Sequence, residues 1–399
     1  MTTTTFVCRA ILLAMALFVV YPYTIYPLCL WILCRFRRHP WKKADSHPRL
    51  SIIIAAHNEE EIIESKIANT LALDYPRHRL EILVASDCST DRTDEIVRNH
   101  GYPVRLIRLE NRSGKQVALN RAVEEATGEI LLFTDAAVFV EPWCAKRLTR
   151  NFADPRVGAV SSVIHISAPK ATNGSPQDAG VAFFKSEREA EGAYLDLDLA
   201  IRKMEADLGS AVGLCGSCYA IRRKCFIPFD PGACNDFLSA LDAVKLGYRA
   251  VVDEEAIGYM LPAKNHAGEF RRKARTIAGG IDTLWRSGAL RSGHGHPIYW
   301  WELISHKVAR WMGPPALLPA AIVSVVGALD RDPLLSVFAA LGFLGLSLAA
   351  VGFLAPAAGK IFLPFRLASF ALIAWLACFW GWVQFLGGAR QVVWTPTTR

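Results

Sequence analysis

Long uncharged stretches lie at both ends of the chain, whereas the middle carries ordinary charge. Residues 10–34 contain no charged side chain, and these 25 residues exceed the roughly 20 that a membrane-spanning helix needs. Basic residues flank the far end of this run and no small-residue cleavage site follows, so an anchor is expected rather than a cleaved signal peptide. Three more uncharged runs are long enough to span: Trp311–Leu329, Pro333–Gly359 and Leu367–Ala389.

Between these ends, short apolar runs alternate with helical patterns. The first four predicted strands are Leu50–Ala55, Leu80–Ala85, Val104–Leu109 and Ile130–Phe133, with a helix expected after each of the first three. Strands that alternate with helices at this spacing predict an α/β domain with a mostly parallel sheet. Later predictions are strands at Val157–Val163, Tyr219–Ile221 and Arg249–Val252, and helices at Phe237–Lys245 and Phe270–Leu284.

The pattern divides the chain into four parts. We expect an anchor and basic linker at 1–48, an α/β domain at 49–290, an amphipathic segment at 291–312 and membrane helices with a short tail at 313–399. Aromatic residues mixed with Lys307 and Arg310 favour an interfacial helix at Pro297–Trp311, although a buried domain helix has the same pattern. The loop Ser167–Gly180 is a candidate lid or a plain surface loop.

The distribution of basic residues predicts the class of partner and the side of the membrane on which the α/β domain lies. The 399 residues carry a net charge of +8, and the basic residues cluster beside apolar spans, which favours anionic lipid headgroups over nucleic acid as partner. Because basic residues crowd the chain after residue 34, the positive-inside rule places the α/β domain in the cytoplasm, on a multi-pass protein of the inner (plasma) membrane. The ten cysteines form no small-domain disulfide framework, and we expect mostly reduced thiols. The number of spans and the side of the C-terminus stay open.

Polar side chains follow three of the predicted strands: His57 and Glu59 after the first, Asp87 after the second and Asp135 after the fourth. In a parallel sheet these ends share one edge, where α/β proteins bind their ligands. A nucleotide diphosphate fits such a cluster, with Asp87 accepting from a base, Glu59 from ribose and Asp135 reaching a metal. Lys115 begins a predicted helix, and its ammonium and the helix N-terminus both favour phosphate.

The chain resembles glycosyltransferase family 2, in its membrane-bound branch of cellulose, hyaluronan and poly-N-acetylglucosamine synthases. The resemblance rests on S-I-I-I-A-A-H-N-E-E-E (51–61), L-E-I-L-V-A-S-D-C-S-T-D-R-T (80–93), G-K-Q-V-A-L-N-R-A (114–122) and T-G-E-I-L-L-F-T-D-A (127–136). It implies a Rossmann-like GT-A domain over 49–290, with Asp87 on uracil and Glu59 near the nucleoside. It also implies that Asp135 is the first acid of a D-x-D metal motif that holds Mg²⁺ or Mn²⁺.

The same resemblance suggests further site residues. L-C-G-S (214–217) is similar to an acceptor-side segment, which implies that Cys215, Gly216 and Ser217 lie beside the acceptor sugar. Asp236, at the head of a predicted helix, takes the place of the catalytic base. Arg272 and Arg275 are a poor match to the motif that contacts diphosphate in processive enzymes.

Three departures from the family pattern bear on function. Ala137 replaces the second acid of D-x-D, Asn235 replaces the acid before the base, and Arg272 and Thr276 replace the Gln and Trp of the processivity motif. The first two departures weaken the expectation of metal dependence and catalysis, and the third weakens that of processivity.

The expected function is therefore inverting transfer from a nucleotide-sugar, for which a UDP-sugar is favoured, to a growing polysaccharide. Two alternatives remain: a transferase that adds one sugar to a lipid, and a degenerate subunit that binds nucleotide and scaffolds a synthase. Expected partners are the donor, a glycan or lipid-linked acceptor, membrane lipids and other synthase subunits, with no nucleic acid. Few spans and no charge within them argue against a transporter.

Overall fold

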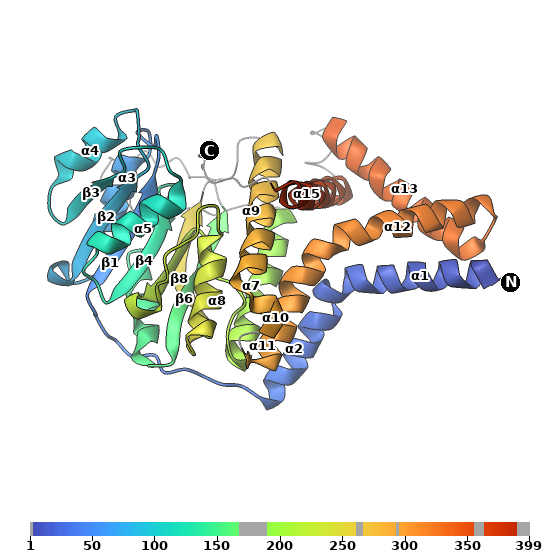
Figure 1. The fold of residues 1–399 in the computed structure, drawn as a ribbon, viewed down its shortest axis with the longest axis horizontal. Coiled ribbons are helices and arrows are strands. Elements are labelled where there is room, and N and C mark those ends of the chain that lie inside the picture. Colours follow the sequence, from blue (N-terminus) through green and yellow to red (C-terminus); the bar gives the residue numbers. More distant parts are fainter. Residues whose placement is uncertain (1–2, 167–189, 261–265, 293–294, 355–362, 389–399) are drawn as a thin grey trace.

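A computed structural model describes residues 3–166, 190–260, 266–292, 295–354 and 363–388. The candidate lid at Ser167–Gly180 and the C-terminal tail after residue 388 therefore lie outside the described residues. An α/β domain with a large sheet occupies one end, and long apolar helices extend from it (Figure 1).

One eight-stranded sheet, in the order β3-β2-β1-β4-β7-β6-β8-β5, forms the centre of the domain. β1 pairs in parallel with β2 and β4, and β2 pairs in parallel with β3, as the alternating pattern predicts. β7 runs antiparallel to β4 and β6, and the short β5 is antiparallel to β8, so the sheet is mixed. The strands are β1 Leu50–Ala56, β2 Leu80–Ser86, β3 Val104–Arg108, β4 Ile130–Asp135, β5 Val138–Val140, β6 Val157–Ile166, β7 Cys218–Arg222 and β8 Arg249–Met260.

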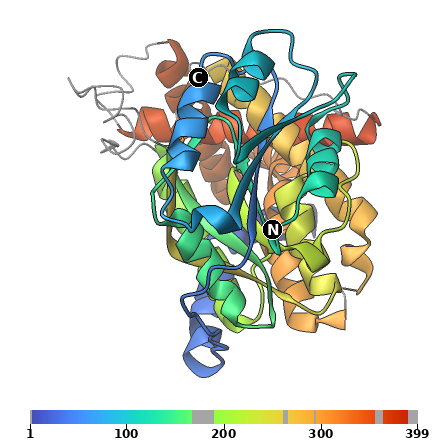
Figure 2. The ribbon, with the colours of Figure 1, turned by 90° about the vertical axis from the view of Figure 1, so that its left-hand side faces the viewer.

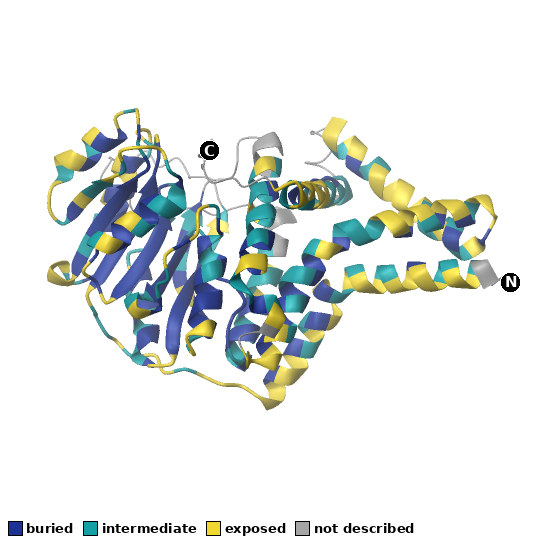
Figure 3. Ribbon diagram, viewed as in Figure 1, coloured by how far each residue is buried: buried dark blue, intermediate teal, exposed yellow. Residues whose placement is uncertain are grey.

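Helices cover both faces of this sheet (Figure 2). They are α3 Ile63–Leu71, α4 Thr93–His100, α5 Lys115–Glu125, α6 Cys144–Thr149 and α8 Asn235–Lys245. Every residue of β1 is buried, because an inner strand with helices on both faces exposes neither side (Figure 3). The helix expected to begin at Asn58 begins only at Ile63, since Asn58 has a φ of 53° and forms a turn instead.

Two further helices join the sheet to the membrane segments. α7 spans Ala190–Leu208 and had no counterpart among the predicted elements, whereas α9, His266–Ser287, extends the basic helix expected at Phe270–Leu284. A short α10, Ala289–Ser292, follows. α7 and α9 both lie between the sheet and the apolar helices (Figure 1).

The N-terminal apolar run forms two helices rather than the single span expected at 10–34. α1, Thr3–Val20, ends in a short 3₁₀ turn at Tyr21–Tyr23, and α2 follows at Ile25–Phe36. Pro22 lies in that turn, and it interrupts the helix because it lacks an N–H and fixes φ. Thr5–Tyr23 alone is long and apolar enough to cross a membrane, whereas α2 is shorter and buries Tyr26 and other side chains against α7.

The C-terminal part contains the other candidate spans. α11 (Pro297–Leu303), a π-helical turn (Ile304–Val308) and α12 (Ala309–Leu329) form one continuous apolar helix, followed by α13 (Pro333–Leu354) and α15 (Leu363–Leu386). By length and composition, Pro297–Leu329, Pro333–Leu354 and Leu367–Leu386 could each cross a membrane. In the segment expected to lie in the interface, Tyr299, Glu302 and His306 are buried against the domain, whereas Ile298 and Trp300 are exposed. Its place in the interface stays a prediction.

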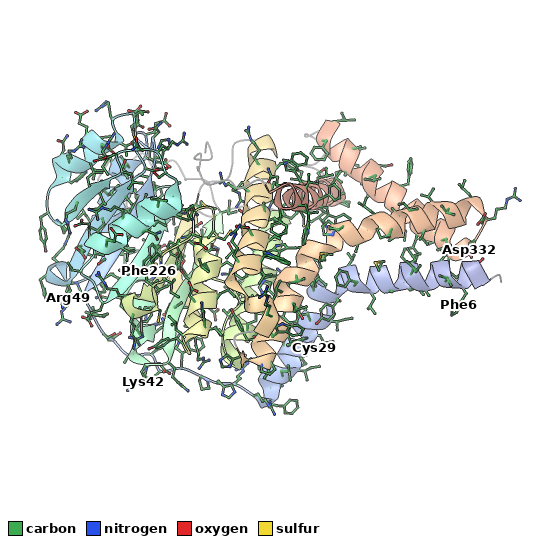
Figure 4. The ribbon with its side chains drawn as sticks, viewed as in Figure 1. Phe6, Cys29, Lys42, Arg49, Phe226 and Asp332 are labelled. Atoms are coloured by element: carbon green, nitrogen blue, oxygen red, sulfur yellow. The ribbon has the colours of Figure 1, made fainter. Side chains whose placement is uncertain are left out.

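α1 and α12 lie side by side and run in opposite directions. The Tyr21 hydroxyl contacts the Ser305 Oγ at 2.7 Å near the domain, and the Arg9 guanidinium pairs with the Asp332 carboxylate at 2.9 Å at the far end. Asp332 and Phe6 are both labelled at that end of the molecule (Figure 4).

Candidate active site

The carboxyl ends of β1, β2 and β4 meet at one edge of the sheet. The register pairs Ala56 with Ser86 and Ala55 with Asp135, which places the residues after each strand next to one another. His57 is buried, and its Nδ1 lies 2.8 Å from the Asp87 carbonyl oxygen. Glu59 follows on the same turn, where its backbone N–H donates to the Thr93 hydroxyl at 2.8 Å.

Asp87 fixes the loop that leads into α5. Its two carboxylate oxygens accept the backbone N–H groups of Ser113 at 2.7 Å and Gly114 at 3.0 Å, and the side chain is 1% exposed. Gly114 has a φ of 97°, a conformation that favours glycine. A nucleobase would have to use the remaining lone pairs of Asp87, so the contact with uracil stays a prediction.

Lys115 and Asp135 form the charged centre of this edge. Lys115 is the first residue of α5, and its Nζ donates to the Asp135 carboxylate at 2.5 Å, with both side chains partly exposed. The ammonium and the N-terminus of α5 therefore point to the position where a diphosphate is expected.

Lys66, which the sequence did not single out, lies beneath this pair. Its fully buried ammonium donates to the Thr134 hydroxyl at 3.1 Å and to the Val138 carbonyl, so it holds the turn that carries Asp135. Burial lowers the pKa of Lys66 to about 8, although the charges of Cys218 and Asp135 oppose this shift. The sequence could not predict this contact, because Lys66 fits the ordinary pattern of the helix α3.

A divalent ion has one protein carboxylate available here. Ala136 and Ala137 follow Asp135, and among the described residues no group of three or more His, Cys, Asp or Glu side chains could hold a metal. Magnesium sites commonly combine one or two carboxylates with substrate phosphates and water. Asp135 thus fits an ion only together with a bound diphosphate.

Asp236 lies in the first turn of α8 and faces the segment expected at the acceptor. A Cβ atom added to Gly216 would lie 3.0 Å from the Asp236 Oδ2, so this glycine leaves room for the carboxylate. Burial raises the pKa of Asp236, and the positive charges of Lys307 and Lys115 oppose that shift.

The neighbouring residues fix the position of α8. Asn235, which stands where the family has an acid, is buried, and its amide donates to the Tyr219 hydroxyl at 2.9 Å. A carboxylate at position 235 would need the Tyr219 hydroxyl as its donor, whereas the amide supplies the proton itself.

The acceptor-side segment is joined to both the sheet and the charged pair. The Cys215 backbone N–H donates to the Ser161 hydroxyl at 2.8 Å, and the Asp135 backbone N–H donates to the Ser217 carbonyl at 3.1 Å. Asp135, Gly216 and Asp236 are therefore neighbours in space although 100 residues lie between the two acids in the sequence. Cys215 and all other cysteines are free thiols, in agreement with the expectation from the sequence.

Arg272 and Arg275 lie on α9 beside the start of α8. The Cys234 backbone N–H donates to the Thr283 hydroxyl of α9 at 2.9 Å. Burial and the neighbouring Arg272 lower the pKa of Arg275, while the charge of Asp135 opposes the shift. Arg275 is thus close enough to Asp135 for their charges to interact.

Lys307 reaches the site from outside the predicted domain. It lies on the π-helical turn before α12, and its Nζ is 3.3 Å from the position of a Cβ on Gly213 and 5.5 Å from the Phe237 ring centroid. The sequence suggested only an interfacial cation, because nothing local to residue 307 indicates contact with α8.

Comparison with known proteins identifies the domain. Residues 51–227 match the family model for glycosyl transferase family 2. Poly-beta-1,6-N-acetyl-D-glucosamine synthase of Staphylococcus aureus (strain COL) is 24% identical over 259 residues, which cover 62% of this chain and 58% of that protein. Probable glycosyltransferase YdaM of Bacillus subtilis (strain 168) is 36% identical over 120 residues, 28% of this chain and 29% of that protein. The matched region is thus less than two thirds of the length of either relative.

A solved structure shares the fold over nearly the whole chain. Mannosyltransferase PcManGT from Pyrobaculum calidifontis, in complex with GDP-Man and Mn²⁺, superposes with a TM-score of 0.71 at 24% identity, covering 95% of this chain and 99% of that chain. The sheet, its helices and the apolar helices at both ends therefore form a GT-A-type glycosyltransferase fold. Within it, residues 51–227 are a glycosyl transferase family 2 domain.

Proposed function

We propose that this protein is a membrane-bound, inverting glycosyltransferase that moves a sugar from a nucleotide-sugar to a growing polysaccharide. The family match and the polysaccharide synthase among the relatives support this class of reaction. We propose a UDP-sugar as donor and a cytoplasmic site, on the basis of the motifs and of the basic residues that follow α2.

One observation carries the proposal: the Asp236 carboxylate lies against Gly216, and the same segment is bonded to the Asp135 strand end beside Lys115. A base, an acceptor segment and a diphosphate-binding cation thus adjoin one another. Sugar transfer requires these three elements, since a hydroxyl must be deprotonated as a nucleotide diphosphate leaves.

Asp236 acts as the general base in this proposal. Its carboxylate takes the proton of the acceptor hydroxyl while the hydroxyl oxygen bonds to C1 of the donor sugar. The bond between C1 and the diphosphate oxygen breaks on the opposite face, so the anomeric configuration inverts. Burial raises the pKa of Asp236 and so makes its carboxylate a stronger base than one in water.

The departing diphosphate is stabilised by positive charge from α5 and α9. Lys115 and the N-terminus of α5 bind its oxygens, and Arg275, with Arg272 on the same helix, adds further charge. Mg²⁺ or Mn²⁺ held by Asp135 and the diphosphate would neutralise part of this charge when bound.

Replacing the base tests the assignment. We expect Asp236→Asn to bind UDP as the wild type does and to lose transfer by about 10²- to 10⁴-fold, the contribution typical of a general base. The measurement is release of nucleotide diphosphate by detergent-purified protein, over a panel of UDP- and GDP-sugars with and without Mn²⁺. Asp230→Asn, at an exposed position before α8, is the matched control. Near-normal turnover by Asp236→Asn would refute the role of the base.

The incomplete metal motif favours one alternative, a non-catalytic subunit that binds nucleotide and scaffolds a synthase. Ala136 and Ala137 supply no metal ligand, and the Lys115 ammonium already pairs with the Asp135 carboxylate. Nucleotide binding without release of diphosphate from any donor, acceptor or metal combination would support this alternative. Products of one added sugar, rather than a ladder, would instead indicate a lipid transferase.

A further inference from the structure

A buried polar network links the candidate membrane span Pro297–Leu329 to the segment expected at the acceptor. Its centre is Arg202 on α7, the helix that lies between the sheet and the apolar helices (Figure 1). Only 9% of Arg202 is exposed, and burying a charged side chain is costly unless it is paired and hydrogen-bonded. The contacts that offset this cost run in two directions, toward β6 and toward the span.

On the side of the sheet, Arg202 contacts a serine whose hydrogen-bonding capacity is fully used. The Oγ of the buried Ser161 donates to the Ser162 carbonyl at 3.1 Å, and it accepts from the Arg202 Nη1 at 3.3 Å and the Cys215 backbone N–H at 2.8 Å. A hydroxyl offers one donor and two acceptor lone pairs, so these three contacts exhaust it. Ser161 thus joins Arg202 to the start of the segment 215–217.

On the side of the span, Arg202 shares one carboxylate with two other basic side chains. Its Nε lies 2.9 Å from the Oδ2 of Asp198, one turn earlier on α7. The Asp198 Oδ1 accepts from the Arg310 Nη1 at 2.8 Å and lies 2.9 Å from the His306 Nε2. Because His306 and Arg310 belong to the candidate span, Asp198 couples Arg202 to that span.

A second carboxylate fixes the height of α7 against the span. Glu205 is fully buried, and its Oε1 accepts from the Tyr26 hydroxyl at 2.6 Å and lies 2.6 Å from the His306 Nδ1. Its Oε2 accepts the Val212 backbone N–H at 3.1 Å. His306 thus bridges Glu205 and Asp198, so α7 cannot slide along the span without breaking both contacts.

The segment held by Ser161 touches both acids of the candidate site. A Cβ on Gly216 would lie 3.0 Å from the Asp236 Oδ2, and the Ser217 carbonyl accepts the Asp135 backbone N–H at 3.1 Å. Gly216 directly follows the residue whose N–H bonds to Ser161, so a displacement there moves the segment against Asp236.

We propose that Arg202 is a positioning residue for the acceptor sugar. Through the Ser161 hydroxyl it holds the segment 215–217 in place beside Asp236, and through Asp198 it ties that segment to the candidate span. The inference rests on the proposed function, which assigns this segment to the acceptor. Arg202 acts through Ser161 and touches no reacting atom, so its loss impairs use of the acceptor and leaves donor binding intact.

Kinetics of the detergent-purified full chain test this role, with fragments of the wild-type glycan product from partial acid hydrolysis as the acceptor. We expect Arg202→Met to raise the KM for these fragments by about tenfold or more, the effect of losing a hydrogen bond to a charged group. The KM for the donor and the release of diphosphate without acceptor should stay at wild-type values. Lys203→Met, which removes a partly exposed neighbour on α7, is the matched control. An equal change of both KM values, or no change, would overturn the proposal.

A double-mutant cycle shows whether Arg202 acts through Ser161. Ser161→Ala should raise the KM for the acceptor by itself, and adding Arg202→Met should raise it little further, because residues of one network are not additive. Arg202→Lys retains the charge beside Asp198 but not the two-sided reach of the guanidinium, so it should melt near the wild type and recover only part of the acceptor affinity. Fully additive effects of Arg202→Met and Ser161→Ala would refute the route through Ser161.

Hydrogen exchange separates this inference from the proposed function, because it needs no substrate. In Arg202→Met the Cys215 amide should exchange about tenfold faster or more, since local opening reports the loss of its partner, while the amides of β1 and β2 keep their wild-type rates. Wild-type exchange at Cys215 would refute the role of Arg202 whatever the activity. Faster exchange in a protein whose wild type transfers no sugar would refute the acceptor role together with the proposed function.

Discussion

At the scale of residues, the missing side chain of Gly216 leaves the space that the Asp236 carboxylate occupies. The Oδ2 of this carboxylate lies 3.0 Å from the place where a Cβ would stand on Gly216, so the proposed base and the proposed acceptor segment touch only because residue 216 has no side chain. The Tyr219–Asn235 hydrogen bond fixes the helix from the other side. A small displacement here should therefore affect catalysis more than folding.

We expect Gly216→Ala to lower kcat by about 10- to 100-fold, since a misplacement of about 1 Å can cost 10²-fold in rate. The melting temperature and the affinity for the nucleotide should change little, because Asp87, Lys115 and the start of α5 are untouched. Gly342→Ala on α13 is the control, since a Cβ there meets no atom within 4 Å. Unchanged kcat in Gly216→Ala would show that the two residues do not adjoin during turnover.

Asp242 on α8 provides a test of pH-dependent stability. Burial raises its pKa from 3.8 to about 6, with Lys245 opposing and Asp230 adding to the shift. Since the folded state then binds the proton more tightly than the unfolded state, stability falls as pH rises from about 4 to 6. Asp242→Asn should therefore stabilise the protein at pH 8, by up to about 3 kcal/mol, and have little effect at pH 4. Melting temperatures at the two pH values decide this, and an equal change at both would contradict it.

At the scale of elements, the π-helical turn Ile304–Val308 brings a cation from the candidate membrane span to α8, the helix of the proposed base. Lys307 lies over the Phe237 ring and beside Gly213, and its positive charge opposes the effect of burial on Asp236. The apolar helix that could cross the membrane is thus electrostatically coupled to the proposed base. Lys115 provides the second such charge, from α5.

Removing this charge should shift the pH profile. In Lys307→Met the pKa of Asp236 should rise, so the acidic limb of kcat/KM moves to higher pH and activity near neutrality falls. Cys215 and Cys234, which also adjoin Asp236, should not contribute, because burial raises the pKa of both thiols and keeps them neutral. Lys245→Met, at the far end of α8, should leave the profile unchanged. A loss of rate without displacement of the acidic limb would assign Lys307 a purely structural role.

At the scale of the whole molecule, the apolar helices are arranged as a unit with the domain at one end. The pair of Arg9 and Asp332 joins the start of α1 to the turn between α12 and α13, while Tyr21 and Ser305 meet near the domain. The helix pair therefore fixes which ends share a side of the membrane. The N-terminus and the turn at 330–332 should lie together, opposite the domain.

Cysteine labelling in sealed vesicles checks this topology. Single cysteines placed at Thr5 and Arg331 in a background without other reactive cysteines should react with an impermeant maleimide from the same side, and one placed at Arg49 should react from the other. Reaction of the first two from opposite sides would show that α1 and α12 do not both cross the membrane as the structure pairs them.

The sequence determined most of the central sheet. The strand ends after β1, β2 and β4 follow from local apolar runs and their polar ends, because buried parallel strands leave a direct pattern in the sequence. The helix that begins at Lys115 follows in the same way, and the helix predicted at Phe237–Lys245 begins two residues earlier, at Asn235. The family motifs added roles for these residues that the pattern alone does not give. Four candidate spans likewise follow from uncharged length.

Only the tertiary structure decided how distant segments meet. The break at Pro22, the burial of α11 against the domain and the approach of Lys66, Gly216 and Lys307 to the site depend on contacts between residues far apart in the chain. Such contacts leave no periodic signal, because a buried lysine in a helix has the same local pattern as an exposed one. The chain thus specified its elements locally, and the packing of α8 against the membrane-associated helices assembled the site.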